Sequence, residues 1–277
     1  MKATKVKGIN LKAKKSLGQH WLRDRNSLIA ICDAAEVSAG DNVFEIGPGM
    51  GDLTSELMTR DVNIFALEID SEAITYLQKI FARQWDVNLH VEQGDIRKFD
   101  FSRLPQGYKI VANIPYYLSA NLLRLLTETS QKPAIAALLV QKEVAERIVA
   151  EAGRMSGISV FCQFYFEASA GLIVPASLFT PPPKVDSQIL VLKKRASLLF
   201  EDVDEKQFFR LVKIGFVNRR KTLTNSLSGG LNISKVQAIK TLNLAGINPN
   251  ARAQELTLTD WYNLYSTYQI ASQKLAA

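Results

Sequence analysis

Short apolar runs alternate with amphipathic stretches over the first half of the chain. The apolar runs have the length of β-strands and lie at residues 43–46, 63–69, 87–91, 109–112 and 134–140. The stretches between them carry apolar residues at helical spacing and lie at residues 52–60, 71–83, 120–129 and 142–151. Near-continuous apolar strands that alternate with helices are typical of a parallel sheet buried on both faces. The pattern therefore predicts an α/β domain built around a mostly parallel sheet.

Segments on either side of this pattern extend the prediction. Apolar residues at helical spacing predict a helix over residues 26–37. The runs 158–167 and 188–192 lie close together without an intervening helix, so we expect them to add antiparallel strands at one edge of the sheet. Beyond Arg195 the strand pattern stops, and a small helical domain is predicted. Its four helices are expected at about residues 204–217, 219–227, 234–244 and 254–269, with breaks at Gly229-Gly230 and at residues 246–249.

The positive charge of the protein is concentrated at the start of the chain. The formal net charge is +7, and residues 1–25 hold eight basic side chains and one acidic side chain, so the rest of the chain is neutral. We predict a basic arm over residues 1–25, an α/β domain over 26–196 and a helical domain over 197–277. A basic arm on an otherwise neutral protein favours a nucleic-acid partner over a merely solubilising role.

Several basic residues are candidates for contacts with the phosphates of RNA. They are Lys12, Lys14, Lys15, Lys184, Arg219, Arg220 and Lys221. The release of counterions on phosphate contact would make binding steeply dependent on salt. A solubilising tail is the alternative for the arm, and a solvated helix face is the alternative for residues 219–221.

Composition argues against several other classes of protein. No apolar run approaches the roughly 18 residues of a membrane-spanning helix, and the N-terminus lacks the apolar segment of a secretory signal. Cys32 and Cys162 lie far apart without partners at metal-ligand spacing, so buried reduced thiols and no metal are expected. With only His20 and His90, the chain offers no Ser-His-Asp set. We predict a monomeric cytoplasmic protein without metal or membrane contact, an organelle being the alternative compartment.

A glycine-rich turn closes the first predicted strand. Gly47, Gly49 and Gly51 lie between strand 43–46 and a helix, where they let the backbone approach a ligand closely. The dinucleotide-binding fingerprint requires another glycine where this chain has Asp52, and an acid there disfavours a pyrophosphate. A nucleoside cofactor without phosphates fits better, and a purely structural turn is the alternative.

Two acidic residues follow the next two strands. Glu68 ends the second strand, where it could accept hydrogen bonds from both hydroxyls of a ribose. Asp95 follows the third strand, where it could accept from the amino group of a cofactor adenine. Each acid alone could be a helix cap. Together with the glycine turn they indicate a nucleoside site, because open α/β sheets bind ligands at the carboxyl ends of their strands.

The fourth strand ends in the tetrapeptide Asn113-Ile114-Pro115-Tyr116. The exocyclic amine of adenine is a poor nucleophile, because its lone pair is delocalised into the ring. Hydrogen bonds from the amine to the Asn113 side-chain oxygen and the Ile114 carbonyl would free that lone pair. Pro115 would stiffen the turn, and Tyr116 would offer a flat face to the base. Placement beside a methyl donor would then provide most of the catalysis without metal or strong base, and a plain turn is the alternative.

A proline-rich segment could form the opposite wall of such a pocket. Phe179 is followed by three prolines within residues 179–187, which make the segment stiff. A base inside a duplex is out of reach and must be flipped, so Phe179 and Tyr116 could hold it between their rings. A rigid linker is the alternative.

These segments together resemble the rRNA adenine N6-dimethyltransferases. The resemblance extends over about residues 12–265 and is carried by residues 18–22, 45–51, 113–116, 141–143 and 179–187. Residues 215–227, which contain Arg219-Arg220-Lys221-Thr222-Leu223, resemble the C-terminal signature of the branch that modifies small-subunit rRNA.

The resemblance implies a Rossmann-like class I methyltransferase domain, with a mostly parallel seven-stranded sheet, followed by a helical RNA-binding domain. It implies transfer of methyl groups from S-adenosylmethionine to two adjacent adenosines in the 3′-terminal hairpin of small-subunit (16S) rRNA during ribosome biogenesis. It assigns target-base contacts to Tyr116 and Phe179. It also assigns cofactor contacts to His20, Leu22, Gly47, Glu68, Asp95 and Asn113, and Gly49 belongs to the same turn. The family usually has Gln-Asn-Phe where this chain has Gln19-His20-Trp21.

Two other functions are compatible with parts of this pattern. The similar enzymes that methylate large-subunit rRNA and block macrolide antibiotics lack the run that begins at Arg219. An assembly factor that binds RNA without catalysis should have lost the cofactor acids or the tetrapeptide. Here Glu68, Asp95, Asn113 and Tyr116 are all intact.

Overall fold

Seven strands form the central sheet of the computed structural model, which describes residues 13–218 and 220–276. The strand order is β4-β3-β2-β5-β6-β9-β7, and the neighbours from β4 to β6 pair in parallel. β9 pairs antiparallel with β6. The strands are β2 (Asn42–Ile46), β3 (Asn63–Glu68), β4 (Leu89–Gln93), β5 (Lys109–Asn113), β6 (Ile135–Gln141), β7 (Phe166–Val174) and β9 (Ser187–Lys194). The predicted mostly parallel seven-stranded sheet is confirmed.

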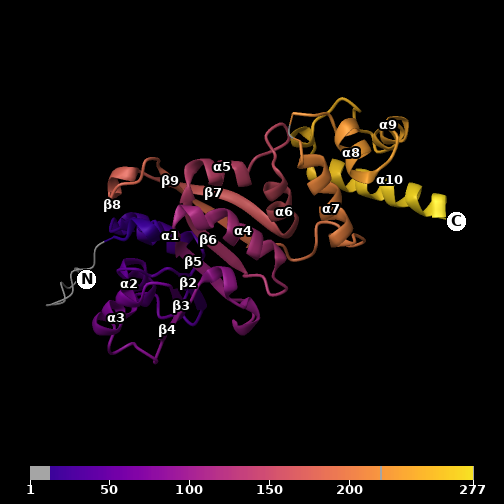
Figure 1. Ribbon diagram of the computed structural model, residues 1–277. Helices are drawn as coiled ribbons and strands as arrows, with labels where there is room; N and C mark the ends of the chain where they lie inside the picture. The colour runs from indigo at the N-terminus through magenta and orange to yellow at the C-terminus, as the bar shows by residue number, and fades with distance from the viewer. Residues whose placement is uncertain (1–12, 219, 277) are drawn as a thin grey trace. The chain divides into compact units, whose positions relative to one another are not determined.

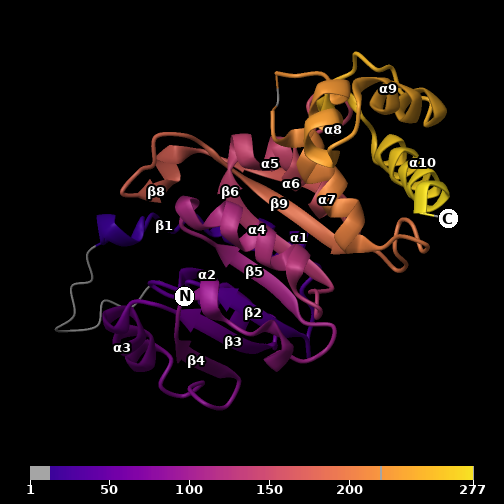
Figure 2. The ribbon, with the colours of Figure 1, turned by 45° about the vertical axis from the view of Figure 1, so that its right-hand side comes forward.

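Helices cover both faces of this sheet (Figures 1 and 2). They are α1 (Arg25–Ala34), α2 (Asp52–Met58), α3 (Ser71–Ile80), α4 (Ser119–Glu128) and α5 (Lys142–Ile148). Successive residues of a strand point to opposite faces, yet Val43 and Phe44 of β2 are both buried. Burial on both faces explains why the strands are apolar throughout instead of alternating.

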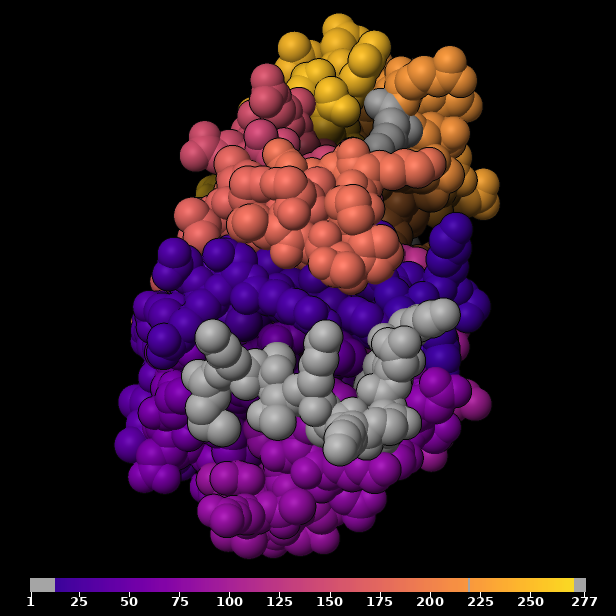
Figure 3. All heavy atoms as spheres, turned by 90° about the vertical axis from the view of Figure 1, so that its left-hand side faces the viewer, coloured from indigo at the N-terminus to yellow at the C-terminus, as the bar shows by residue number. Residues whose placement is uncertain are grey.

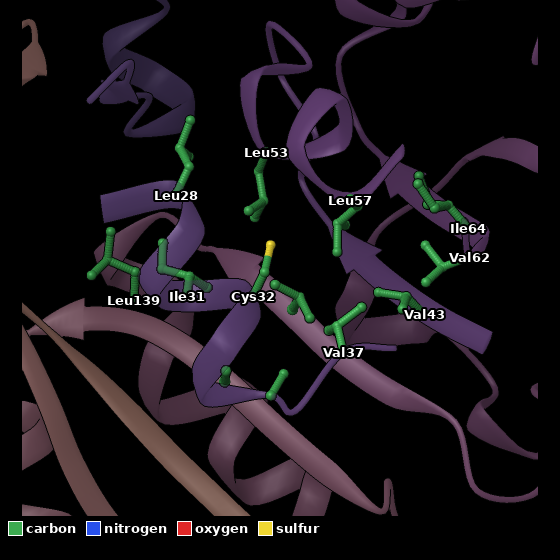
Figure 4. Close-up of a cluster of buried hydrophobic side chains, with 14 of the residues drawn as sticks. Leu28, Ile31, Cys32, Val37, Val43, Leu53, Leu57, Val62, Ile64 and Leu139 are labelled. Carbon is green, nitrogen blue, oxygen red and sulfur yellow. The ribbon is translucent and has the colours of Figure 1, made fainter. Parts of the chain in front are cut away.

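The core on one face joins α1, α2 and α3 to the strands. Ile31 and Cys32 of α1 and Leu57 of α2 are fully buried there against Val43 of β2 and Ile64 of β3. Figure 4 shows these side chains pointing from the two helices toward the sheet. Their burial fixes α2 directly after the glycine turn, and so it positions that turn at the end of β2.

A small two-stranded ribbon lies beside the main sheet. β1 (Trp21–Leu22) follows the short helix η1 (Lys15–Leu17) and pairs antiparallel with β8 (Phe179–Thr180). Figure 3 shows the segment that carries β8 lying along the segment that carries β1. Much of the predicted arm over residues 1–25 is therefore part of the fold, because residues 13–25 contain η1 and β1. Lys12 and the basic residues before it lie outside the described residues.

The backbone contacts divide the chain into two compact units. The first comprises residues 13–146 and Glu167–Lys194, and the second comprises Arg147–Phe166 and residues from Arg195 onward. The second unit contains α6 (Gly157–Tyr165), α7 (Glu205–Phe216), α8 (Leu223–Leu231), α9 (Lys235–Leu244) and α10 (Leu258–Ala276). Phe164 of α6 packs on Phe208 and Phe209 of α7, which explains why residues 147–166 group with the helices. No helix in the described ranges is long and apolar enough to cross a bilayer.

The strand predicted over residues 158–167 is wrong. The chain forms α6 there, and the strand β7 begins only at Phe166. Ser156 and Ser159 cap the start of α6 through reciprocal hydrogen bonds. Because α6 is apolar on nearly all sides, its periodicity does not distinguish a buried helix from a buried strand.

The helix break predicted at Gly229-Gly230 is also wrong. Both glycines lie inside α8, and the helix ends at Leu231, before Asn232 in the left-handed conformation. A Cβ atom on Gly230 would overlap the Ile214 side chain of α7. The glycine therefore serves the close approach of two helices. The break predicted after α9 is confirmed, since α9 ends at Leu244 and Gly246 has a positive φ.

Candidate active site

The glycine turn opens a cleft at the carboxyl ends of the strands. Gly47 has φ 70°, and no atom lies within 4 Å of the place where a Cβ would be. The backbone at Gly47 is therefore open to the cleft. Gly51 has φ 78°, and a Cβ atom there would lie 2.7 Å from Phe81. Both positions therefore require glycine. The cleft encloses about 1060 Å³, its open mouth included, and Gly49 also lines it.

Glu68 links the end of β3 to this turn. It is 4% exposed, and its carboxylate accepts hydrogen bonds from the main-chain nitrogens of Ile69 at 2.8 Å, Asp70 at 2.9 Å and Gly49 at 3.0 Å. Burial raises the pKa of Glu68, and the three hydrogen bonds oppose that rise. A carboxylate held in one orientation at the cleft wall, with acceptor capacity left, is suited to hold a ribose.

Asp95 lines the same cleft after β4. Its carboxylate accepts from the Arg97 main-chain nitrogen at 2.9 Å and pairs with the Arg97 guanidinium. These contacts lower the pKa of Asp95, chiefly through the side-chain hydrogen bond from Arg97. The group is therefore an ionised acceptor, which could take a hydrogen bond from an amino group.

Two buried polar atoms in the cleft wall have no partner within the described residues. They are Oε1 of Glu45 and Nε1 of Trp21. An unpaired buried polar group is costly, so both atoms point to a ligand that satisfies them. Asp52 also lines the cleft, and with Glu68 and Asp95 it makes the cleft acidic. An acidic cleft beside bare glycine backbone fits a positively charged nucleoside.

The carboxyl of Glu45 is expected to make the stability of the protein depend on pH. It is 1% exposed, and burial raises its pKa from 4.5 to about 8 although Thr54 donates a hydrogen bond to it at 2.7 Å. The native state therefore holds a proton that the unfolded chain releases. This contribution to stability is complete below about pH 4.5 and is lost as the pH rises toward 8.

Urea unfolding of the cofactor-free protein at pH 6 and pH 8 measures this loss. Between the two pH values, the wild-type protein should lose about 2–3 kcal/mol more unfolding free energy than a Glu45→Gln variant, which has no proton to release. An equal loss in both proteins would show that Glu45 is already ionised at pH 6.

The tetrapeptide that begins at the end of β5 lies in the same cleft, which Asn113, Ile114, Pro115 and Tyr116 all line. The Asn113 amide nitrogen donates to the His20 carbonyl oxygen at 3.3 Å, which leaves the amide oxygen as an acceptor. The Tyr116 hydroxyl shares a hydrogen bond of 2.7 Å with the Ser187 hydroxyl. The amide and the ring are thus each held in place by a partner from a distant segment.

Phe179 does not reach the cleft in this structure. It pairs with Leu22 in the β1–β8 ribbon and is 3% exposed in the hydrophobic core. Leu22 is also 3% exposed but does line the cleft. In this arrangement β8 turns the Phe179 ring toward the core, and the base contact that the resemblance assigns to Phe179 stays a prediction.

The basic candidates have different surroundings. Lys14 is held by Asp70 at 2.8 Å and Glu72 at 3.2 Å, so its ammonium ties η1 to the loop after Glu68. Lys15 and Lys184 are exposed in the first unit, and Arg220 and Lys221 are exposed before α8 in the second. Lys12 and Arg219 lie outside the described residues. No sequence pattern pointed to the acids that hold Lys14, because the pairing spans more than fifty residues.

The described residues contain no group of three or more His, Cys, Asp or Glu that could hold a metal ion. They contain a mostly parallel sheet with a glycine turn after β2, an acid at the end of β3, an acid after β4 and a polar tetrapeptide that begins at the end of β5. This combination defines the chain as a class I methyltransferase fold.

Comparison with known proteins narrows the class. The sequence profile described as "Ribosomal RNA adenine dimethylase" matches residues 10–269. The protein "Ribosomal RNA small subunit methyltransferase A" of Dehalococcoides mccartyi strain 195 is 39% identical over 95% of this chain and 91% of its own. The protein with the same name from Streptococcus agalactiae is 39% identical over 91% of this chain and 90% of its own. The chain belongs to the ribosomal RNA adenine dimethylase family.

Solved structures agree with this membership. A dimethyladenosine transferase from Plasmodium falciparum superposes with a TM-score of 0.78 at 26% identity, over 91% of this chain and 98% of its own. The 23S rRNA methyltransferase ErmE superposes with a TM-score of 0.74 at 26% identity, over 90% of this chain and 99% of its own. The predicted methyltransferase fold and the predicted enzyme class are confirmed.

Proposed function

We propose that this protein transfers methyl groups from S-adenosylmethionine to N6 of two adjacent adenosines in the 3′-terminal hairpin of small-subunit rRNA. The observation that carries the proposal is the position of Asn113 and Tyr116 in one cleft with Gly47, Glu68 and Asp95. The choice of the small subunit rests on the names of the relatives at 39% identity. We further propose that it works as a monomer in the cytoplasm during ribosome biogenesis.

The cofactor would be held by groups at the ends of three strands. Glu68 would accept from the ribose hydroxyls, Asp95 from the adenine amine, and the bare backbone at Gly47 and Gly49 would allow close approach. Glu45, with its unpaired carboxyl oxygen at the cleft wall, would add a hydrogen bond to the cofactor. When bound, S-adenosylmethionine supplies a methyl group on a cationic sulfur, which becomes a neutral thioether once the methyl group has left.

The tetrapeptide would prepare the target amine. Asn113 Oδ1 and the Ile114 carbonyl would accept its two hydrogens, so that the nitrogen lone pair points at the methyl carbon. The hydrogen bond from Asn113 to His20 fixes the amide in advance, and Pro115, at φ −55°, limits motion of the turn. After transfer, the ammonium is acidic enough to release its proton to water. Tyr116 would hold the flipped base by stacking.

Labelled small subunits provide the direct test. Subunits from a bacterial strain that lacks this methyltransferase would be incubated with the purified protein and methyl-labelled cofactor, and the modified bases mapped. Label on two adjacent adenosines of the 3′-terminal hairpin supports the proposal. Label on large-subunit rRNA would favour the macrolide-resistance activity, and binding without label would favour an assembly factor.

The helical unit is proposed to contribute affinity for RNA through the basic residues before α8. Replacing Arg219, Arg220 and Lys221 together by Ala should weaken binding to all RNAs. It should also reduce the slope of log K against log salt concentration by about 2–3, because roughly 0.7–0.9 counterions are released per phosphate contact.

A matched triple variant shows whether the salt dependence of RNA binding depends on where the basic residues lie in the helical unit. Lys206, Arg210 and Lys213 are exposed on α7, so replacing them removes the same charge from the same unit. We expect this control to reduce the slope by less than half as much as the triple variant before α8. If both triple variants change the slope equally, residues 219–221 act only through net charge.

A further inference from the structure

A second aromatic ring lies against Tyr116. The imidazole of His20 stacks on the Tyr116 ring, with 5.8 Å between the ring centroids and 21° between their planes. Nδ1 of His20 lies 2.7 Å from the Pro181 carbonyl oxygen, at the start of the three prolines. Both rings line the cleft. Three segments that are distant in the sequence therefore meet around this pair of rings.

The main chain and the side chain of His20 contact different parts of the site. The main-chain carbonyl accepts the hydrogen bond from Asn113, whereas the ring contacts Tyr116 and Pro181. None of the described hydrogen bonds joins the His20 ring to Glu68 or Asp95. The contacts of the side chain thus tie it to the turn that carries Tyr116 and to the proline segment.

The resemblance does not predict an aromatic ring at the position of His20. The family usually has Asn where this chain has His20, and the Phe179 side chain of β8 is buried in the hydrophobic core. Tyr116 is partly buried, and its hydroxyl is held by Ser187. With His20 on one face of its ring and Ser187 at its hydroxyl, Tyr116 has little freedom to tilt.

We propose that His20 is a positioning residue for the target base, which backs the Tyr116 ring and ties it to Pro181. The inference rests on the proposed methylation of adenine. A stacking surface that is already rigid loses less conformational freedom when the base arrives, so the base binds more tightly to it. Because the His20 carbonyl also holds Asn113, the same residue keeps the stacking ring and the amine acceptor in register.

Three substitutions in the full-length protein separate the ring from its hydrogen bond. His20→Phe retains a ring without the bond to Pro181, His20→Asn retains a polar group without the ring, and His20→Ala removes both. The probe is an RNA hairpin with 2-aminopurine in place of one target adenosine, whose fluorescence reports unstacking and capture of the base. Steady-state kinetics on the unmodified hairpin give KM and kcat, and calorimetry gives the affinity for cofactor.

We expect capture of the base to depend on an aromatic ring at position 20. His20→Phe should capture the base nearly as well as the wild type, whereas His20→Ala and His20→Asn should raise KM for RNA by about 10-fold, which corresponds to a part of one base-stacking contact. The resemblance also assigns a cofactor contact to His20, so the two losses are compared: in His20→Ala and His20→Asn, cofactor affinity should fall less than base capture does. Rescue by Phe distinguishes a stacking role from general damage to the fold.

A double-mutant cycle with Tyr116→Ala completes the test. If His20 acts through Tyr116, removing the His20 ring should add little once the Tyr116 ring is absent. Fully additive effects, or a loss of cofactor affinity that matches the loss of base capture, would overturn the inference. Failure of the proposed function is a different result, since the wild-type protein would then not methylate the hairpin at all.

Discussion

Replacing Asn113 by Ala should reduce kcat for methyl transfer by about 100-fold to 1000-fold, the range seen when one preorganised hydrogen-bonding partner of a transition state is removed. In the proposed mechanism the amide oxygen is the acceptor that frees the lone pair of the adenine amine, and the Ala side chain has no acceptor to replace it. Single-turnover methylation of an RNA hairpin that contains the target adenosines measures the rate. RNA affinity should change little, because phosphate contacts supply most of it.

Two further variants make that result specific. Asn113→Asp retains an oxygen acceptor but cannot donate to the His20 carbonyl, so it should lose less activity than Asn113→Ala. Asn63→Ala removes an exposed asparagine at the start of β3, at the opposite end of the strands, and should leave kcat unchanged. Near-normal turnover of the Asn113→Ala protein would remove this residue from the mechanism.

Replacing Glu68 by Ala should weaken binding of S-adenosylmethionine by about 100-fold or more. A hydrogen bond to a charged group contributes roughly 1.5–3 kcal/mol, and the carboxylate would accept two from the ribose. The variant also leaves the main-chain nitrogens of Gly49, Ile69 and Asp70 without their acceptor. Both effects act on the cofactor side of the cleft, and calorimetry with the cofactor measures their sum.

The loss of cofactor affinity in Glu68→Ala must be distinguished from a general loss of structure. Affinity for RNA in the absence of cofactor should remain within about 2-fold of wild type, a change of under half a kcal/mol. Glu128→Ala, which removes an exposed carboxylate from α4, should change neither affinity. If Glu68→Ala binds the cofactor as tightly as the wild type, the nucleoside is held elsewhere.

The strands and most helices could be predicted from the sequence because the signals are local. The buried strands are apolar on both faces, and the glycine turn, Glu68, Asp95 and Asn113 each lie at the end of one of them or within two residues of it. In a parallel sheet all such positions meet at one edge. Placing these residues in one cleft therefore required only the order of the elements along the chain.

Other features had no local signal. The two-residue strands β1 and β8 form only because they meet each other, and α6 has no polar face to distinguish it from a strand. Gly230 is explained by the approach of Ile214 from another helix rather than by a turn. Lys14 finds Asp70 and Glu72 across more than fifty residues of chain.

The sequence by itself determined the class of fold and the edge of the sheet at which the glycine turn, Glu68, Asp95 and Asn113 meet. These depend on periodicity and on the position of a residue relative to its own strand. The tertiary structure alone decided which way individual side chains face. It turned Phe179 into the core, placed the His20 ring on Tyr116 and left Glu45 with an unpaired oxygen in the cleft. Orientation of this kind depends on packing between segments that are distant in the chain, which no local pattern records.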